Sequence, residues 1–273
     1  MTRSRAFEVE VVPALTPAGA GALADAAFEL FRKSAFTLLV ISAATNVPLF
    51  ASVAALVLFV RDRGWSWGTF GYFAVLAMLG VAAALAAWLR AIGTGAMAFA
   101  AARGGASRPA GPAASLGAAL RVGATLPLVC AIRFGSIAIG LMACALPGVT
   151  VIAGLAMAPH AVVLEGHGVA SAMARSLRLA AAGATGLAAA GALVIAIYLV
   201  GTLQLLLALR LAEALLTLAI PSLPGGWLAR PETPWLLLGA AKVLADPFVS
   251  SATAAVWMDA RIRADGLDLE LRA

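Results

Sequence analysis

No charged residue occurs between Lys33 and Arg61. This uncharged stretch is longer than the ~20 residues that an α-helix needs to cross the hydrocarbon core of a bilayer. Similar stretches recur along the chain, and 63% of all residues are hydrophobic whereas 12% are charged. A soluble fold cannot bury so much apolar surface, since this composition lies far from that of globular domains. The sequence therefore predicts an integral membrane protein.

The uncharged stretches predict an all-α integral membrane fold with six transmembrane helices. Between them, short connectors use up nearly all the remaining residues, so we expect a single membrane domain over 16–273. A polar tail, 1–15, precedes this domain, and a second short tail, 259–273, closes it. The expected spans are roughly 35–60, 66–89, 122–146, 148–165, 183–209 and 234–258.

Three shorter segments have the pattern of amphipathic helices that lie in the membrane interface. The first begins near Pro17, since proline suits the first turn of a helix, and continues to about residue 34. The second lies near 115–121 and the third near 169–181. In the third segment the expected apolar face consists of Met173, Ala174, Leu177 and Ala181.

An interfacial helix followed by two spans thus recurs three times along the chain. Two explanations remain open at this point. The pattern is either a threefold repeat of a helix plus a hairpin, or a consequence of alanine-rich sequence aligning with itself.

Basic residues are distributed unevenly over the predicted loops. If the N-terminus is cytoplasmic, most of the arginines and lysines outside the spans lie on the cytoplasmic side, as is usual for membrane proteins. The sequence therefore predicts that both termini are cytoplasmic. The net charge of +6 reflects these juxtamembrane residues, which favour contact with anionic lipid headgroups and do not indicate a nucleic-acid partner.

Three charged residues lie inside the predicted spans and away from their ends: Arg133, Lys242 and Asp246. A charge at the centre of a bilayer costs at least ~2.5–3.5 kcal/mol on insertion scales, so such a side chain should face protein or water. Arg133 and Asp246 each lie about halfway along their spans, and Lys242 precedes Asp246 by one helical turn. We expect a buried cluster of these three residues, which either pins two spans together or binds an anionic group.

A second set of charges lies where the predicted span 148–165 ends. Glu165 is expected at the interface, and basic residues follow it on the third amphipathic helix and on the C-terminal tail. Ion pairs from Glu165 to these residues would close the cytoplasmic face as a belt. The expected basic members of this belt are Arg175, Arg178, Arg261 and Arg263.

The sequence carries no pattern typical of an enzyme. His160 and His167 have no further His, Cys, Asp or Glu at ligand spacing, so we expect no metal. No serine lies in a nucleophile elbow, and no glycine-rich phosphate loop or dinucleotide fingerprint occurs, so we expect no cofactor.

Several short motifs resemble the bacterial membrane family named after the membrane domain of glycerophosphoryl diester phosphodiesterase. They lie at residues 23–32, 146–148, 159–166, 172–179 and 257–270. The resemblance implies a six-span protein of the bacterial cytoplasmic (inner) membrane. It does not imply hydrolase activity, because this chain has no room for the phosphodiesterase domain and the motifs supply no catalytic residue.

Two functions compete on the sequence alone. The first is a non-enzymatic accessory or scaffold protein that organises lipid or partner proteins, and short loops favour it. The second is a small transporter or lipid-binding protein that uses Arg133, Lys242 and Asp246. A second membrane protein and a second copy of the chain are both open as partners, in addition to anionic membrane lipids.

Overall fold

A computed structural model of the chain is helical throughout the residues that it describes, which include no strand. These residues are 19–63, 69–104, 109–143, 154–182, 203–204, 207–208, 210–215, 217–219 and 233–265. The main helices are α1 (Ala20–Arg63), α2 (Thr69–Arg103), α3 (Pro112–Arg121), α4 (Thr125–Ala143), α6 (Ala158–Glu165), α7 (Val169–Ala182) and α9 (Thr233–Asp265).

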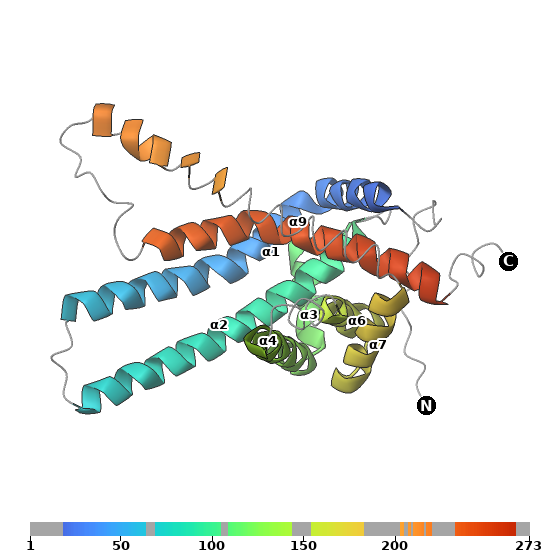
Figure 1. Ribbon diagram of the computed structural model, residues 1–273, viewed down its shortest axis with the longest axis horizontal. Helices are drawn as coiled ribbons and strands as arrows, with labels where there is room; N and C mark the ends of the chain where they lie inside the picture. Colours follow the sequence, from blue (N-terminus) through green and yellow to red (C-terminus); the bar gives the residue numbers. More distant parts are fainter. Residues whose placement is uncertain are drawn as a thin grey trace.

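Three of these helices are long and apolar enough to cross a membrane. Their qualifying segments are Gly21–Ala55 in α1, Gly80–Arg103 in α2 and Leu236–Asp265 in α9. The three helices pack against one another, and in Figure 1 α1 begins at the same end of the bundle at which α2 and α9 end. The described chain therefore supports a membrane protein with three such helices, or four if α3 and α4 form one broken span.

Helix α1 joins two elements that the sequence predicts as separate. The expected interfacial helix and the first span form one continuous helix of 44 residues. At ~1.5 Å per residue it is about 66 Å long, about twice the ~30 Å thickness of the hydrocarbon core. Part of α1 must therefore project beyond this core. Its first turns bury Leu23, Ala27 and Leu30, which share one face of the helix by their spacing.

The expected span 122–146 is broken at its start. Helices α3 and α4 meet at an angle of 82° across residues 122–124. Gly123 has a φ of +63° there, a conformation that glycine adopts without steric cost and that ends α3. Figure 1 shows α4 nearly end-on while α1, α2 and α9 run across the view. Helix α4 is thus steeply inclined to these three helices.

The described residues cover the last three expected spans to different extents. Of the expected span 148–165, the described part contains α6, which has only 8 residues and cannot cross a membrane alone. The expected span 183–209 lies almost entirely outside the described residues. The last expected span, 234–258, lies within α9. Six spans and a threefold repeat therefore stay predictions.

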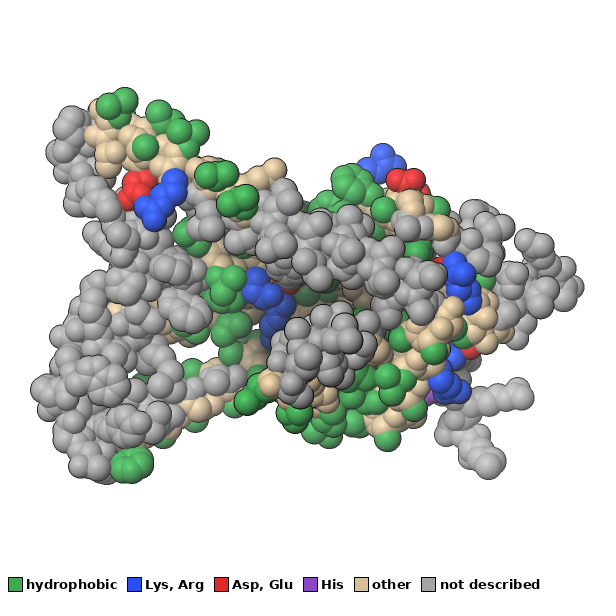
Figure 2. Space-filling view, viewed as in Figure 1, with side chains coloured by type: hydrophobic (Ala, Val, Ile, Leu, Met, Phe, Trp, Pro, Cys, Tyr) green, Lys and Arg blue, Asp and Glu red, His purple; other side chains and the backbone are tan. Residues whose placement is uncertain are grey.

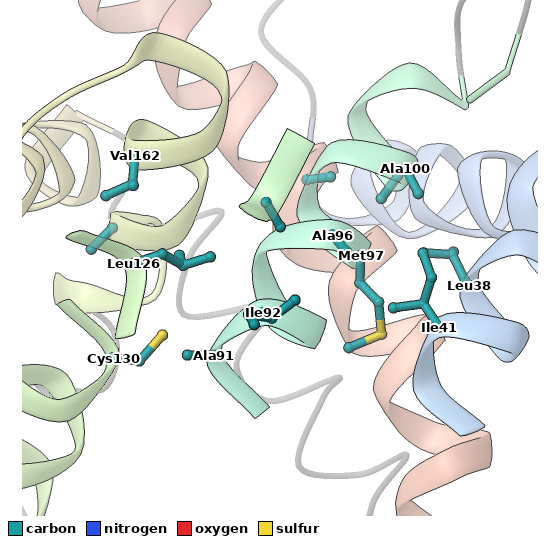
Figure 3. Close-up of a cluster of buried hydrophobic side chains, with 14 of the residues drawn as sticks. Leu38, Ile41, Ala91, Ile92, Ala96, Met97, Ala100, Leu126, Cys130 and Val162 are labelled. Atoms are coloured by element: carbon teal, nitrogen blue, oxygen red, sulfur yellow. The ribbon is translucent and has the colours of Figure 1, made fainter. Parts of the chain in front are cut away.

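Small residues allow α2 to approach its neighbours closely. Ala91, Ala96 and Ala100 of α2 are buried in the main hydrophobic cluster, between Leu38 on α1 and Leu126 on α4 (Figure 3). In a membrane, such small side chains let helix backbones come together and gain van der Waals contact. Helices α1, α2 and α9 form a three-helix unit, and α2 connects this unit to the lobe formed by α3, α4, α6 and α7.

Helix α7 buries a different face from the one that its hydropathy predicts. Its buried residues are Ala172, Ser176 and Leu179, whereas Leu177 is 53% exposed. The predicted apolar face was therefore wrong. On the buried face the hydroxyl of Ser176 donates a hydrogen bond of 2.7 Å to the carbonyl of Gly154, which gives this polar side chain a partner inside the protein.

Candidate functional site

A central polar cluster joins the three long helices: Asn46 of α1, Arg90 of α2, and Lys242 and Asp246 of α9. Arg90 Nη1 donates to Oδ2 of Asp246 at 2.6 Å, and the amide of Asn46 donates to the same oxygen at 3.1 Å. Lys242 Nζ lies 3.4 Å from Oδ1 of Asp246. The Asp246 residue is only 4% exposed, so its charge is balanced by these partners within the protein.

The arginine that meets Asp246 is Arg90, and the predicted pairing of Asp246 with Arg133 is wrong. Arg90 lies directly after the expected span 66–89, because the first charged residue was taken as the end of that span. Helix α2 continues to Arg103, and residues 91–102 carry no charge. This second uncharged run is the signal that places Arg90 inside the bundle. Asn46 is a further member of the cluster that the sequence analysis did not assign to it.

Arg133 lies apart from this carboxylate on α4. It is partly buried, and no hydrogen bond or ion pair joins it to another residue in the described part of the chain. It lies within electrostatic range of Arg90 on α2 and of His160 on α6.

Four charged side chains form a closed ring where the ends of α6 and α9 meet α7. The members of this terminal ring are Glu165, Arg175, Arg261 and Asp265. Arg175 donates from Nε to Glu165 at 3.1 Å and from Nη1 to Asp265 at 2.8 Å. Arg261 Nε lies 3.3 Å from Glu165 and 3.4 Å from Asp265. Each carboxylate therefore meets both arginines, and the ring ties α7 to the three-helix unit.

The terminal ring differs in membership from the predicted belt. Arg263 pairs with Asp259 at 2.8 Å instead of with Glu165. Arg178 is exposed and makes no hydrogen bond or ion pair with any described residue. His167 adds a contact of 3.0 Å to Glu165. Asp265, which the sequence analysis did not assign to the belt, completes the ring.

The charge of Arg175 is secured by its two carboxylate partners. Hydrogen bonds to Asp265 and to Glu165 outweigh partial burial, and they hold the pKa of the Arg175 guanidinium above its ordinary value. Arg175 therefore keeps its positive charge within the ring.

Removing one carboxylate charge from the terminal ring should loosen α7. We expect Glu165→Gln to lower the free energy of unfolding by about 1–3 kcal/mol, because hydrogen bonds to charged groups contribute this much where they are largely buried. Thermal or denaturant unfolding in lipid nanodiscs measures the change. Arg178→Gln is the matched control and should change stability by less than about 0.5 kcal/mol. Equal stability of the two variants would contradict a role for the ring.

An aromatic pair lies between the terminal ring and the main hydrophobic cluster. The rings of His160 and Trp257 stack at 6.1 Å, and the guanidinium of Arg261 lies 5.0 Å from the centre of the Trp257 ring. Both nitrogens of His160 and the indole nitrogen of Trp257 are buried without a hydrogen-bond partner among the described residues. Buried polar atoms without partners are rare in proteins, and ordered water often satisfies them.

Neither a search for metal-binding groups nor a comparison with known proteins assigns a function to these clusters. Within the described residues, no group of three or more His, Cys, Asp and Glu side chains lies close enough together to hold a metal ion. No protein-family model, no curated protein and no solved structure matches this chain. The family resemblance in the sequence therefore stays a prediction.

Proposed function

We propose that this chain is a non-enzymatic multi-pass membrane protein that acts as a scaffold for anionic lipid. The proposal rests on one observation: the buried ionisable groups pair with one another between helices. Asp246 is occupied by Arg90, Asn46 and Lys242, which tie α1, α2 and α9 together. The carboxylates of the terminal ring tie α7 to α9. Both networks hold helices together, which suits a scaffold.

The outer surface supports contact with lipid. Large hydrophobic side chains are exposed along the long helices, among them Phe36 at 76%, Val81 at 61% and Leu244 at 59%. Acyl chains would cover such a surface, because exposed apolar area of this extent is unfavourable in water. Hydrophobic side chains lie over much of the described surface in Figure 2.

Basic residues supply the preference for anionic lipid. Arg32, Arg121 and Arg178 are exposed and make no hydrogen bond or ion pair within the described chain. A basic residue near an anionic leaflet contributes about 1 kcal/mol of attraction. These three arginines therefore favour anionic headgroups around the protein.

Basic residues of the long helices support an orientation. Lys33 lies in the first third of α1, Arg103 ends α2, and Arg263 lies near the end of α9. These helix ends share one end of the bundle (Figure 1). We propose that this basic end faces the cytoplasm of a bacterial cell, since basic residues flank spans on the cytoplasmic side.

The lipid composition around the protein tests the scaffold function. The protein is placed in vesicles with equal amounts of phosphatidylcholine and phosphatidylglycerol and extracted in polymer nanodiscs, and the lipids in the discs are quantified. We expect phosphatidylglycerol above its share in the vesicles, less so at high salt. The enrichment should fall in the combined Arg32→Gln, Arg121→Gln and Arg178→Gln variant. A disc composition equal to that of the vesicles would contradict the proposal.

The alternative function, a transporter, gives a different result in the same vesicles. A protein that moves phospholipid across the bilayer exposes labelled inner-leaflet lipid to a quencher added outside. A scaffold leaves the quenched fraction at the level of protein-free vesicles. Faster quenching that depends on Asp246 would favour transport over the scaffold function.

A further inference from the structure

Arg133 has an unusual combination of position and surroundings. It lies in α4, a helix that is uncharged elsewhere, and no hydrogen bond or ion pair within the described chain satisfies its guanidinium. Arginine keeps its charge in proteins, so this side chain needs an acceptor. An intramembrane charge without a protein partner points to a functional site.

The neighbouring helix adds positive charge to this position. Figure 3 shows Cys130 of α4 beside Ala91 of α2. Arg133 follows Cys130 by three residues and so lies on the same side of α4, and Arg90 directly precedes Ala91. The two guanidinium groups are within electrostatic range of each other. Arg90 shares Asp246 with Lys242, so this region holds more positive than negative charge among its described residues.

A second observation concerns α6, which packs against α4. His160 of α6 is 3% exposed, and neither of its ring nitrogens has a hydrogen-bond partner in the described structure. Arg133 lies within electrostatic range of His160. An anion beside Arg133 would balance its charge and offer an oxygen acceptor to a ring N–H of His160.

The outer surface of α4 distinguishes a lipid from a free anion. Phe134 is 59% exposed, Ile139 is 70% exposed and Met142 is 88% exposed. By helical spacing Phe134 and Ile139 lie to either side of Arg133 around α4 and Met142 lies opposite it, so Phe134 and Ile139 are the side chains that acyl chains beside Arg133 would contact. A phosphate that carries acyl chains fits both the charge and this surface, whereas inorganic phosphate fits the charge alone.

We infer that Arg133, supported by the field of Arg90 and by His160, binds the phosphate group of an anionic phospholipid against α4. This inference deepens the proposed function by assigning one specific lipid site within the scaffold. It rests on the proposed function for the choice of an anionic lipid, and on Arg133 and His160 for the position of the site.

Native mass spectrometry tests the lipid site. The protein is reconstituted with equal amounts of phosphatidylcholine and phosphatidylglycerol, and the lipid retained after mild detergent is measured against detergent concentration. We expect wild type to retain one phosphatidylglycerol, and Arg133→Gln to bind it about tenfold more weakly, because a charge-assisted hydrogen bond is lost. Arg133→Lys keeps the charge and should lie between them. Arg210→Gln, which removes an exposed arginine that pairs with Glu213, should match wild type.

Two further measurements separate loss of the lipid site from loss of folding, and a lipid ligand from free phosphate. Melting temperatures show whether Arg133→Gln folds; if it does not, the comparison of Arg133→Lys with wild type decides. Inorganic phosphate is added to protein in phosphatidylcholine alone: protection against unfolding equal to that from phosphatidylglycerol would overturn the lipid as the ligand. Equal retention of phosphatidylglycerol by wild type and all folded variants would overturn the site.

The lipid site and the scaffold function can fail independently. Enrichment of anionic lipid in nanodiscs without an Arg133-dependent retained lipid would overturn the site and leave the scaffold function standing. An Arg133-dependent retained lipid without general enrichment would support the site and contradict the scaffold function.

Discussion

Replacing Asp246 with alanine should destabilise the protein by about 3–5 kcal/mol, because breaking a buried ion pair leaves an uncompensated charge. Arg90 and Lys242 would both lose their shared carboxylate, with 23% of each side chain exposed. The free energy of unfolding in lipid nanodiscs, or the melting temperature, measures this loss.

A matched acidic residue gives the control for Asp246. Asp25 is exposed near the start of α1, and it makes no hydrogen bond or ion pair with the described residues. Asp25→Ala should change stability by less than about 0.5 kcal/mol. Replacing both Asp246 and Arg90 with leucine should recover part of the stability lost in Asp246→Ala, since most of the uncompensated charge is then removed. Similar stability of Asp246→Ala and Asp25→Ala would contradict the role of the central polar cluster.

A second large effect is expected at the contact between α1 and α2. A Cβ atom on Gly93 would lie 2.6 Å from Oγ1, 2.8 Å from Cγ2 and 2.9 Å from Cβ of Thr45. Thr45 is held in place, since its hydroxyl donates to the carbonyl of Ile41 at 2.9 Å. Gly93→Ala should therefore push the helices apart and cost about 1–3 kcal/mol, as overpacking does in well-packed cores.

Gly80 provides the control on the same helix. A Cβ atom on Gly80 would meet no atom within 4 Å, and the residue is exposed. Gly80→Ala should stabilise the protein by about 0.5–1 kcal/mol, because alanine loses less conformational entropy than glycine in a helix. The two substitutions are chemically identical, and we expect opposite signs in unfolding measurements. A loss of the same size in both variants would show that helix contact at Gly93 is not the cause.

The chain's general class could be predicted because it depends on average hydropathy and on period. The run without charge from Lys33 to Arg61 lies within α1, and the amphipathic segment expected from about Pro17 to residue 34 is helical over its described part. Hydropathy failed where one charge interrupts an otherwise apolar helix. It ended the second expected span at residue 89, although the apolar segment of α2 that could cross a membrane continues through small residues to Arg103.

Partners of charged residues were harder to predict than their presence. Position along a span suggested Arg133 for Asp246, but helix packing brings Arg90 there instead. The steep inclination of α4 (Figure 1) changes which residues share a depth, and no sequence pattern encodes that angle. Glu165, Arg175 and Arg261 were predicted together as an acid and two bases beyond the spans, whereas Asp265 was missed because only basic partners for Glu165 were considered.

The most direct measurement of the central claim is a pair of double-mutant cycles on unfolding free energy. One cycle combines Arg90→Gln with Asp246→Asn, and the other combines Arg133→Gln with Asp246→Asn. We expect a coupling energy of about 1–3 kcal/mol for Arg90 with Asp246, and additivity within about 0.5 kcal/mol for Arg133 with Asp246. Coupling of Asp246 to Arg133, together with additivity for Arg90, would contradict the central polar cluster as the tie between α1, α2 and α9.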